Sequence, residues 1–217
     1  MKKINLKLLA VTSFLTLLPI LVGLLLWKQL PVVIPSHFGF DGTADGFSSK
    51  AEVVFMIPAI MTLLHVFLIF VTSKDPKAKN VAPKMSTFIY WMIPLISGLV
   101  QLSIYGAILG WVHNPTRMGF IFLGILFMIL GNYLPKIKQN YTVGIKLPWT
   151  LNDEDNWNKT HRLAGKLWVL GGFIILVNEW LRWAVPFVFI GTILVMVFLP
   201  MVYSYWLSHV KEKNDKI

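Results

Sequence analysis

Cysteine is absent from this 217-residue chain, and acidic residues are few. Without cysteine there are no disulfides, no thiol nucleophile and no cysteine-built metal site. Only 14% of the residues are charged, whereas 56% are hydrophobic, and the mean hydropathy is +0.66. The apolar residues come in uninterrupted runs rather than amphipathic stripes. The core of a soluble protein of this size cannot bury runs of this length. The composition therefore indicates an integral membrane protein.

Six apolar runs are long enough to cross a bilayer. A membrane-spanning helix needs about 20 residues to cover a hydrocarbon layer of roughly 30 Å. Lipid offers no partner for free backbone groups, and the runs lack the alternation of a membrane barrel, so helices are expected. The predicted fold is thus an all-α bundle of about six transmembrane helices. These spans cover approximately residues 8–27, 53–72, 87–111, 118–134, 163–180 and 184–207.

The basic residues are divided unevenly between the two sides of the membrane. If the N-terminus is cytoplasmic, 16 of the 20 Lys and Arg residues lie inside, and Lys28, Lys50, Arg117 and Arg182 lie outside. The positive-inside rule then places both termini in the cytoplasm. Topology and attraction to anionic lipid explain the net charge of +10, so no direct contact with nucleic acid is expected. The inside set is Lys2, Lys3, Lys7, Lys74, Lys77, Lys79, Lys84, Lys136, Lys138, Lys146, Lys159, Arg162, Lys166, Lys211, Lys213 and Lys216.

The chain is expected to form one membrane domain, residues 1–217, in the cell membrane. The first span, which no cleavage site follows, is expected to be retained as an anchor. An N-terminal helix pair, residues 8–72, carries an extracellular loop at 28–52. A second helix pair, residues 118–180, carries a cytoplasmic loop at 135–165. No nucleotide-binding loop and no soluble domain is found, and neither a cofactor nor catalysis is expected.

The extracellular loop is rich in turn-forming residues. Pro31 and Pro35 favour an extended entry, and three glycines favour tight turns. Its polar set is His37, Asp41 and Asp45. A histidine and two carboxylates suit a divalent cation only if three or four ligands converge, which this spacing does not establish. The expected alternative is a turn network in which Asp side chains accept hydrogen bonds from nearby backbone amides.

The segment from Gly131 to Lys166 concentrates the polar and Trp residues of the chain. Asn132 lies at the end of the fourth span, and Pro135 terminates that helix. Beyond them the sequence predicts a constrained turn. Its members are Gly144, Lys146 and Pro148, and the next residue, Trp149, is expected to pack into the end of the bundle.

A helix is predicted to begin between Thr150 and Asp155, with Asn152 as its cap and the acidic residues in its first turn. Trp157 and His161 then share one face, which is expected to lie along the membrane surface before the fifth span. Thr160 and Arg162 point elsewhere, and Arg162 is expected to pair with Asp155 or with a lipid phosphate.

His65 lies deep in the second span and Gln101 in the third, and Asn178 and Glu179 lie near the outer end of the fifth. An ionisable residue in the membrane is by default a functional candidate, because an unpaired charge is costly there. A neutral histidine that hydrogen-bonds across helices costs less, so we expect His65 to serve packing. A gating or proton-linked role is the alternative.

Both loops resemble those of a known family. The extracellular loop resembles a short domain of unknown function that often precedes the immunity domain of the SdpI family, and the cytoplasmic segment is similar to that family's signature. The first resemblance rests on Leu30-Pro31, Ile34-Pro35, His37-Phe38, Gly42, Asp45-Gly46 and Lys50. The second rests on Gly131-Asn132-Tyr133, Pro135, Asn140-Tyr141, Gly144-Ile145-Lys146, Pro148-Trp149-Thr150-Leu151, Trp157, Thr160-His161-Arg162 and Gly165-Lys166.

The resemblance implies a bacterial membrane protein that confers immunity against a secreted, sporulation-delaying peptide toxin. It also implies a receptor role, in which the toxin-engaged protein retains a cytoplasmic transcriptional repressor at the membrane. The implied outer site contains His37, Asp41 and Asp45. The implied inner site contains Asn132, Pro135, Asn140, Gly144, Lys146, Pro148, Trp149, Thr150, Trp157, Thr160, His161 and Arg162.

Three alternatives stay open. The glycine, proline and tryptophan positions of the inner loop also suit a purely fold-determining role. A small transporter that exports a peptide or lipid is the main functional rival, although paired broken helices are missing. A membrane enzyme would use His161 with Asp153, Glu154 or Asp155 as an acid-base pair, which needs converging geometry.

Overall fold

The computed structural model describes residues 3–214, and of residues 211–214 only the backbone. Lys2 and Lys216, and the side chains of Lys211 and Lys213, therefore lie outside the described part of the chain. Each of the six predicted spans overlaps a long apolar helix, which confirms the all-α, multi-span membrane fold. The long helices are α1 (Leu6–Leu25), α2 (Ile57–Lys74), α3 (Pro83–Ile108), α4 (Pro115–Tyr133), α6 (Glu154–Leu181) and α7 (Val185–Asn214).

The described residues form two compact units. The N-terminal unit contains residues 3–74 and 83–119, and the C-terminal unit contains residues 75–82 and 120–214. Shorter elements connect the long helices. They are β1 (Val33–Phe38), β2 (Ala44–Ser49), the π-helix η1 (Glu52–Met56), the 3-10 helices η2 (Ala78–Asn80) and η3 (Leu134–Lys136), and α5 (Pro148–Asn152).

In the N-terminal unit, α1, α2 and α3 pack through buried polar contacts as well as apolar ones. The Thr12 hydroxyl and Nε2 of His65 lie 2.8 Å apart in a hydrogen bond between α1 and α2. The Gln101 side-chain amide donates to the carbonyl of Val53 at 2.8 Å, inside the π-helical turn η1. Polar side chains in lipid-embedded bundles find partners on neighbouring helices, since lipid offers none.

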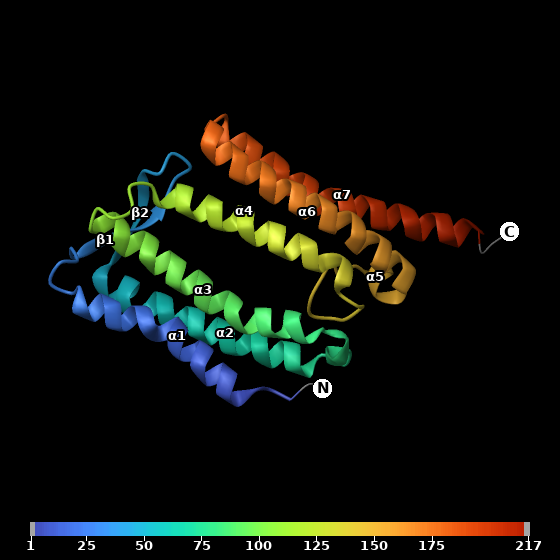
Figure 1. The fold of residues 1–217 in the computed structure, drawn as a ribbon, viewed down its shortest axis with the longest axis horizontal. Coiled ribbons are helices and arrows are strands. Elements are labelled where there is room, and N and C mark those ends of the chain that lie inside the picture. Colours follow the sequence, from blue (N-terminus) through green and yellow to red (C-terminus); the bar gives the residue numbers. More distant parts are fainter. Residues whose placement is uncertain (1–2, 215–217) are drawn as a thin grey trace. The chain divides into compact units, whose positions relative to one another are not determined.

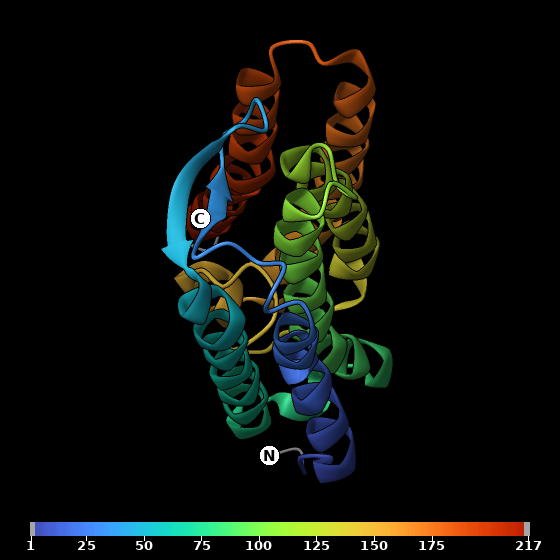
Figure 2. The same ribbon diagram turned by 90° about the vertical axis from the view of Figure 1, so that its left-hand side faces the viewer.

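The loop at 28–52, which is expected to be extracellular, contains a β-hairpin, which the turn signals of the sequence did not predict. β1 and β2 pair antiparallel, with register shifts on either side of His37. Figure 2 shows the hairpin beyond the ends of α1 and α2, which it connects. Ile34 is fully buried in one cluster with Leu30, Val53 and Tyr105. The base of the hairpin therefore packs against the apolar core of the N-terminal unit.

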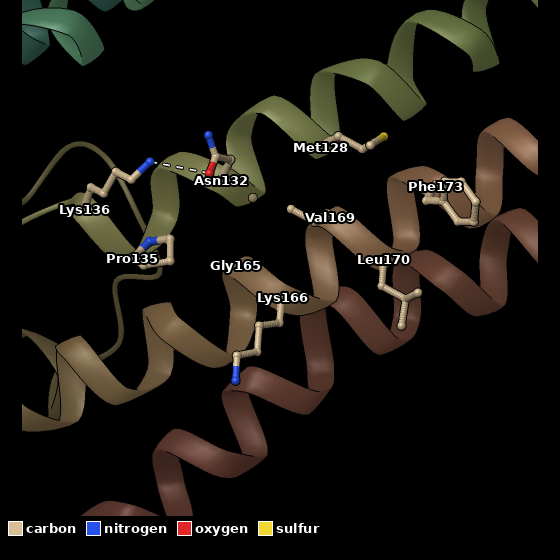
Figure 3. Close-up of a pocket in the computed structure, with 10 residues that line it drawn as sticks. Met128, Asn132, Pro135, Lys136, Gly165, Lys166, Val169, Leu170 and Phe173 are labelled. Carbon is tan, nitrogen blue, oxygen red and sulfur yellow. Dashed lines mark hydrogen bonds between the residues drawn. The ribbon is translucent and has the colours of Figure 1, made fainter.

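In the C-terminal unit, α4 and α6 approach so closely that only glycine fits between them. A Cβ on Gly131 would lie 2.8 Å from the carbonyl oxygen of Gly165, and one on Gly165 would lie 2.7 Å from that of Gly131. Gly124 and Gly172 repeat this reciprocal contact seven residues along each helix. We call this contact the glycine seam, and a groove of about 570 Å³ runs along part of it (Figure 3). Close backbone approach through small residues stabilises helix pairs in lipid.

α6 and α7 lie side by side as an antiparallel pair (Figure 1). α6 ends at Leu181, and the backbone of the capping residue Arg182 is left-handed with φ 51°. The Arg182 guanidinium pairs with the buried Glu179 carboxylate at 2.9 Å, which compensates the burial of that charge. The predicted surface helix and the fifth span are parts of this one continuous helix.

The predicted cap of this helix is wrong by one residue. Asn152 is the last residue of α5, and Asp153 caps α6 by accepting hydrogen bonds from the amides of Asp155 and Asn156. The carboxylate also lies favourably at the positive end of the helix dipole.

Candidate functional site

Two loops that are far apart in sequence meet in the C-terminal unit. One is residues 75–82, between α2 and α3, and the other is residues 134–162, between α4 and the first turns of α6. We call these two segments together the inner cluster. By the distribution of basic residues, both are expected on the cytoplasmic side.

Asp75 joins the two loops. Its side chain is almost fully buried, and one carboxylate oxygen accepts hydrogen bonds from the amide of Tyr141 at 2.9 Å and the hydroxyl of Thr142 at 2.8 Å. The other oxygen accepts from the amide of Lys77 at 2.7 Å. The sequence analysis missed Asp75. One signal was available, because it is the only acidic residue between Glu52 and Asp153.

Gln139 makes the second connection. Its side-chain oxygen accepts a hydrogen bond from Lys77 Nζ, and its backbone carbonyl accepts one from the Asn80 side chain at 2.7 Å. Its side-chain nitrogen donates to the carbonyls of Thr150 and Leu151 at 2.8 and 2.9 Å, at α5. Gln139 thereby links the first loop to α5 within the second loop through hydrogen bonds.

Asn140 organises the turn that follows. Its buried side-chain nitrogen donates to the carbonyls of Lys138 and Val143, both at 2.9 Å. Its oxygen accepts from the amides of Thr142 and Val143 at 2.9 and 2.7 Å. Since all of these partners are in the same turn, the side chain serves the loop and is not available to another molecule.

The rings of Trp157 and His161 pack against the inner side of this loop. Their rings stack with centroids 4.0 Å apart and an interplanar angle of 22°. The indole nitrogen of Trp157 donates to the carbonyl of Ile137 at 2.7 Å, and Nε2 of His161 accepts from the amide of Ile145 at 2.9 Å. Gly144 lies on top with φ 119°, and a Cβ there would lie 2.5 Å from Nε2 of His161. Only glycine fits this position.

Thr150 and Trp149 hold α5 in place, the first by hydrogen bonds to the preceding loop and the second by packing against α7. The Thr150 hydroxyl donates toward the carbonyls of Ile145 and Leu147 and accepts from the amide of Leu147 at 2.9 Å. Trp149 packs edge-on against Tyr205 of α7, with ring centroids 5.4 Å apart. This is the packing into the bundle end that the sequence predicted. Farther along α6, Thr160 bonds to the buried Asn156.

Ten of the twelve residues assigned to the inner site divide into two sets, and the other two, Gly144 and Trp149, are half-buried. The buried set builds the loop, and the exposed set is available to a partner. The buried set is Asn140, Thr150, Trp157, Thr160 and His161, and the exposed set is Asn132, Pro135, Lys146, Pro148 and Arg162. Tyr141, which the sequence analysis did not assign, is also exposed and lies beside Lys77, whose Nζ is 5.4 Å from the ring centre.

His161, the candidate base of an acid-base pair, is held by backbone groups. Both ring nitrogens of His161 are engaged by backbone groups, those of Trp157 and Ile145. Asp153 caps α6, and Asp155 pairs with Lys159 at 2.7 Å. That ion pair also differs from the predicted one between Asp155 and Arg162.

The outer polar residues lie on the hairpin of the N-terminal unit. His37 Nδ1 and Asp45 Oδ1 form an exposed pair across the strands at 2.5 Å. Asp41 instead accepts hydrogen bonds from the hydroxyl and amide of Thr43, which lower the pKa of its carboxyl, as in the predicted turn network. Among residues 3–210, whose side chains the structure describes, no three His, Cys, Asp or Glu side chains gather as a metal site would require.

These features define a class of protein. It is a small multi-pass helical membrane protein with a folded hairpin between its first two spans and a folded polar loop between its fourth and fifth. The chain belongs to the SdpI/YfhL protein family, which matches residues 136–204. A domain of unknown function (DUF1648) matches residues 14–62. The predicted family is thereby confirmed, and the chain is a multi-pass protein of the cell membrane.

One relative is a curated protein of known name. The chain is 32% identical over 160 residues to "Immunity protein SdpI" of Bacillus subtilis (strain 168), a stretch that covers 74% of this chain and 75% of the relative. No solved structure is similar enough to count as a match. The two family matches include the hairpin and most of the second loop of the inner cluster.

Proposed function

We propose that this chain is a membrane immunity protein that protects its cell against a secreted antimicrobial peptide of the sporulation-delaying kind. The observation that carries the proposal is the 32% identity over 160 residues to a protein named for immunity. The organisation of the loops supports it, since polar residues outside the spans build folded loops and both ring nitrogens of His161 are engaged by backbone groups of the inner cluster. A protein that binds, rather than transforms, suits this arrangement.

In this proposal the toxin meets the hairpin. The strands and their approach expose large apolar side chains, with Val32 78%, Val33 58% and Phe47 61% exposed. Exposed apolar patches of this kind commonly mark interaction sites. The hairpin is also braced, because Thr116 donates to the carbonyl of Gly39 at 2.8 Å and Ile34 is buried in the core. A preorganised surface loses less entropy on binding.

The finer proposal is a signalling role for the inner cluster. Its exposed residues include the cations Lys146 and Arg162 and the aromatic ring of Tyr141. Arginine and tyrosine are enriched at protein interfaces, and a basic surface favours an acidic partner. We propose that a cytoplasmic transcriptional repressor binds there once toxin has been engaged outside.

A two-arm survival experiment tests both levels. A toxin-sensitive bacterium would express the chain, the outer variant Val33→Ser/Phe47→Ser or the inner variant Lys146→Ala/Arg162→Ala, at equal membrane abundance, and would be challenged with the sporulation-delaying peptide. The wild type and the inner variant should protect, and the outer variant should not. A fluorescent repressor should reach the membrane only with the wild type.

Each arm has an outcome that contradicts it. If the wild type gives no protection, immunity against this peptide is wrong, and energy-dependent efflux by the reconstituted protein would identify a transporter instead. If the outer variant protects fully, the hairpin is not the toxin site. If the inner variant still recruits the repressor, the exposed cations are not its docking surface.

A further inference from the structure

The hairpin joins the membrane helices through a turn of unusual geometry. β2 ends at Ser49, and the π-helix η1 (Glu52–Met56) follows it and runs directly into α2 (Figure 2). At the end of η1 the amide of Ile57 donates to the carbonyl of Glu52, five residues back. In an α-helix the same amide would donate to the carbonyl of Val53. Single π-helical turns are rare and frequently lie at functional sites.

Pro58, the next residue along the chain, explains why this turn is π-helical. In an α-helix its nitrogen would face the carbonyl of Val54, but proline has no N–H group and its ring clashes with that carbonyl. The π-helical turn creates a second problem at Val53. The α-helical donor of that carbonyl, Ile57, is already bonded to Glu52, and the π-helical donor would be Pro58 itself. The helix therefore offers the carbonyl of Val53 no backbone donor.

Gln101 of α3 supplies the missing donor. Its side-chain nitrogen donates to the carbonyl of Val53 at 2.8 Å, and both residues are almost fully buried. Among the described residues, the side-chain oxygen of Gln101 has no hydrogen-bond partner. Burial of an amide with half of its polar atoms unpaired is costly, and an apolar side chain would pack here at a lower cost. The contact with η1 therefore accounts for a glutamine at this position.

The same turn is bonded to the hairpin. The amide of Ser49 donates to the Glu52 carboxylate at 2.7 Å, and the amide of Glu52 donates to the Ser49 hydroxyl at 3.3 Å. Ile34 of β1 is buried in one cluster with Val53. One residue more or less in a helical turn changes the direction in which the chain leaves it by about 100°. The form of η1 therefore sets the direction of the hairpin relative to α2.

We propose that Gln101 is a positioning residue for the outer site, because together with Pro58 it holds η1 in the π-helical form and so fixes the direction of the hairpin. This role rests on the proposed function, in which the toxin meets the hairpin. Pro58 disfavours the α-helical alternative, and Gln101 satisfies the carbonyl that the π-helical form leaves over. Without both residues the turn relaxes to a regular α-helix, and the hairpin leaves α2 in another direction.

Electron paramagnetic resonance of the full chain in lipid nanodiscs tests this role without toxin. The chain has no cysteine, so spin labels attach only to introduced ones, Ala44→Cys on β2 and Leu63→Cys on α2, both at exposed positions. Gln101→Met removes the donor and keeps an unbranched side chain, and Pro58→Ala supplies the N–H group that an α-helix needs. The double variant Gln101→Met/Pro58→Ala should shift the distance between the labels to a new population. Each single variant should show part of that shift.

Ser97→Ala provides the matched control. Ser97 lies one turn before Gln101 on α3 and donates a buried hydrogen bond of 3.1 Å to the carbonyl of Thr16 in α1. Its replacement removes a hydrogen bond of the same kind that η1 does not share, so the label distance should stay that of the wild type. Survival under toxin gives a second readout. At equal membrane abundance, protection should be lost with Gln101→Met/Pro58→Ala and kept with Ser97→Ala.

Three results would overturn the proposal. They are a wild-type label distance in the double variant, an equal shift with Ser97→Ala, and full protection by a double variant whose hairpin has moved. If the wild type itself does not protect, the proposed function fails, but the label distance still decides whether Gln101 and Pro58 hold the hairpin. If Gln101→Met does not fold, Pro58→Ala decides the question alone, because alanine is the better helix former.

Discussion

Nε2 of His161 accepts a hydrogen bond of 2.9 Å from the backbone amide of Ile145. The other ring nitrogen, Nδ1, lies 2.8 Å from the carbonyl of Trp157 and therefore carries the proton. The ring is thus a neutral imidazole with both nitrogens committed to the loop and to its own helix. His161 can therefore affect a binding partner only indirectly, because it fixes the conformation of the loop whose surface the partner would contact.

Replacing His161 should therefore loosen the loop. His161→Ala removes the acceptor of the Ile145 amide and the ring stacked on Trp157, so it should lower the free energy of unfolding by about 2–4 kcal/mol. Protease cleavage within residues 137–150 should accelerate. The neighbour Arg162, which is exposed, provides the control, and Arg162→Ala should stay within about 0.5 kcal/mol of the wild type. Equal cleavage rates in the two variants would contradict this role.

Gly144 should tolerate no side chain. Its φ of 119° is unfavourable for any L-residue with a Cβ, and that Cβ would lie 2.5 Å from Nε2 of His161. Gly144→Ala should cost about 1–3 kcal/mol of stability, measured by thermal unfolding in detergent. Gly119 has open space around its Cβ position inside α4, so Gly119→Ala should instead stabilise by about 0.5–1 kcal/mol. A stabilised Gly144→Ala would refute the described turn.

Asp75 should be replaceable by neither Ala nor Asn. Asn keeps the shape but turns one oxygen into an N–H₂ group that faces the donors of Tyr141 and Thr142, or of Lys77. We expect Asp75→Asn to destabilise the chain by about 1–3 kcal/mol, because buried donors lose their acceptor. Asp155→Asn removes an equal charge from an exposed site and should leave the melting temperature unchanged. Equal melting temperatures for the two variants would argue against the bond between the loops.

The membrane spans were predictable because each one is a run of about 20 mostly apolar residues, and the mean hydropathy of such a run is a strong signal. The course of the first turns of α6 was not. They were expected to lie along the membrane surface before a span that starts at Leu163, whereas one helix runs from Glu154 through both parts, with Asn156 buried against Ser204 and Thr160 bonded to Asn156. Burial of polar residues by tertiary contacts cannot be read from hydropathy.

The two loop structures were partly predictable. Trp157 and His161 were placed on one helix face from their spacing, and they stack there. The role of Asp75 depends on an encounter with Tyr141, 66 residues away, which no local pattern encodes. The hairpin was missed because Pro35 and Gly46 lie within its strands, and both residue types are depleted in strands.

The His37 and Asp45 pair should matter little for stability. Both side chains are largely exposed, 74% and 52%, and solvent screens such pairs. His37→Ala should therefore leave the melting temperature unchanged, because the hairpin is held by Ile34 and its cluster. If the same variant lowers toxin resistance, the loss comes from the outer surface itself. A large drop in melting temperature would show instead that the pair holds the hairpin together.

The glycine seam should be the most sensitive part of the C-terminal unit. A Cβ on Gly131 would lie 2.7 Å from the amide nitrogen of Val169 and 2.8 Å from the carbonyl oxygen of Gly165, so neither helix can accommodate it without moving apart. We expect Gly131→Ala to cost about 1–3 kcal/mol, as overpacking does elsewhere. Gly191 in α7 has no atom within 4 Å of its Cβ position, so Gly191→Ala should not destabilise. Thermal unfolding of both variants in one detergent makes the comparison, and a Gly131→Ala protein as stable as the Gly191→Ala protein would contradict the close approach of α4 and α6.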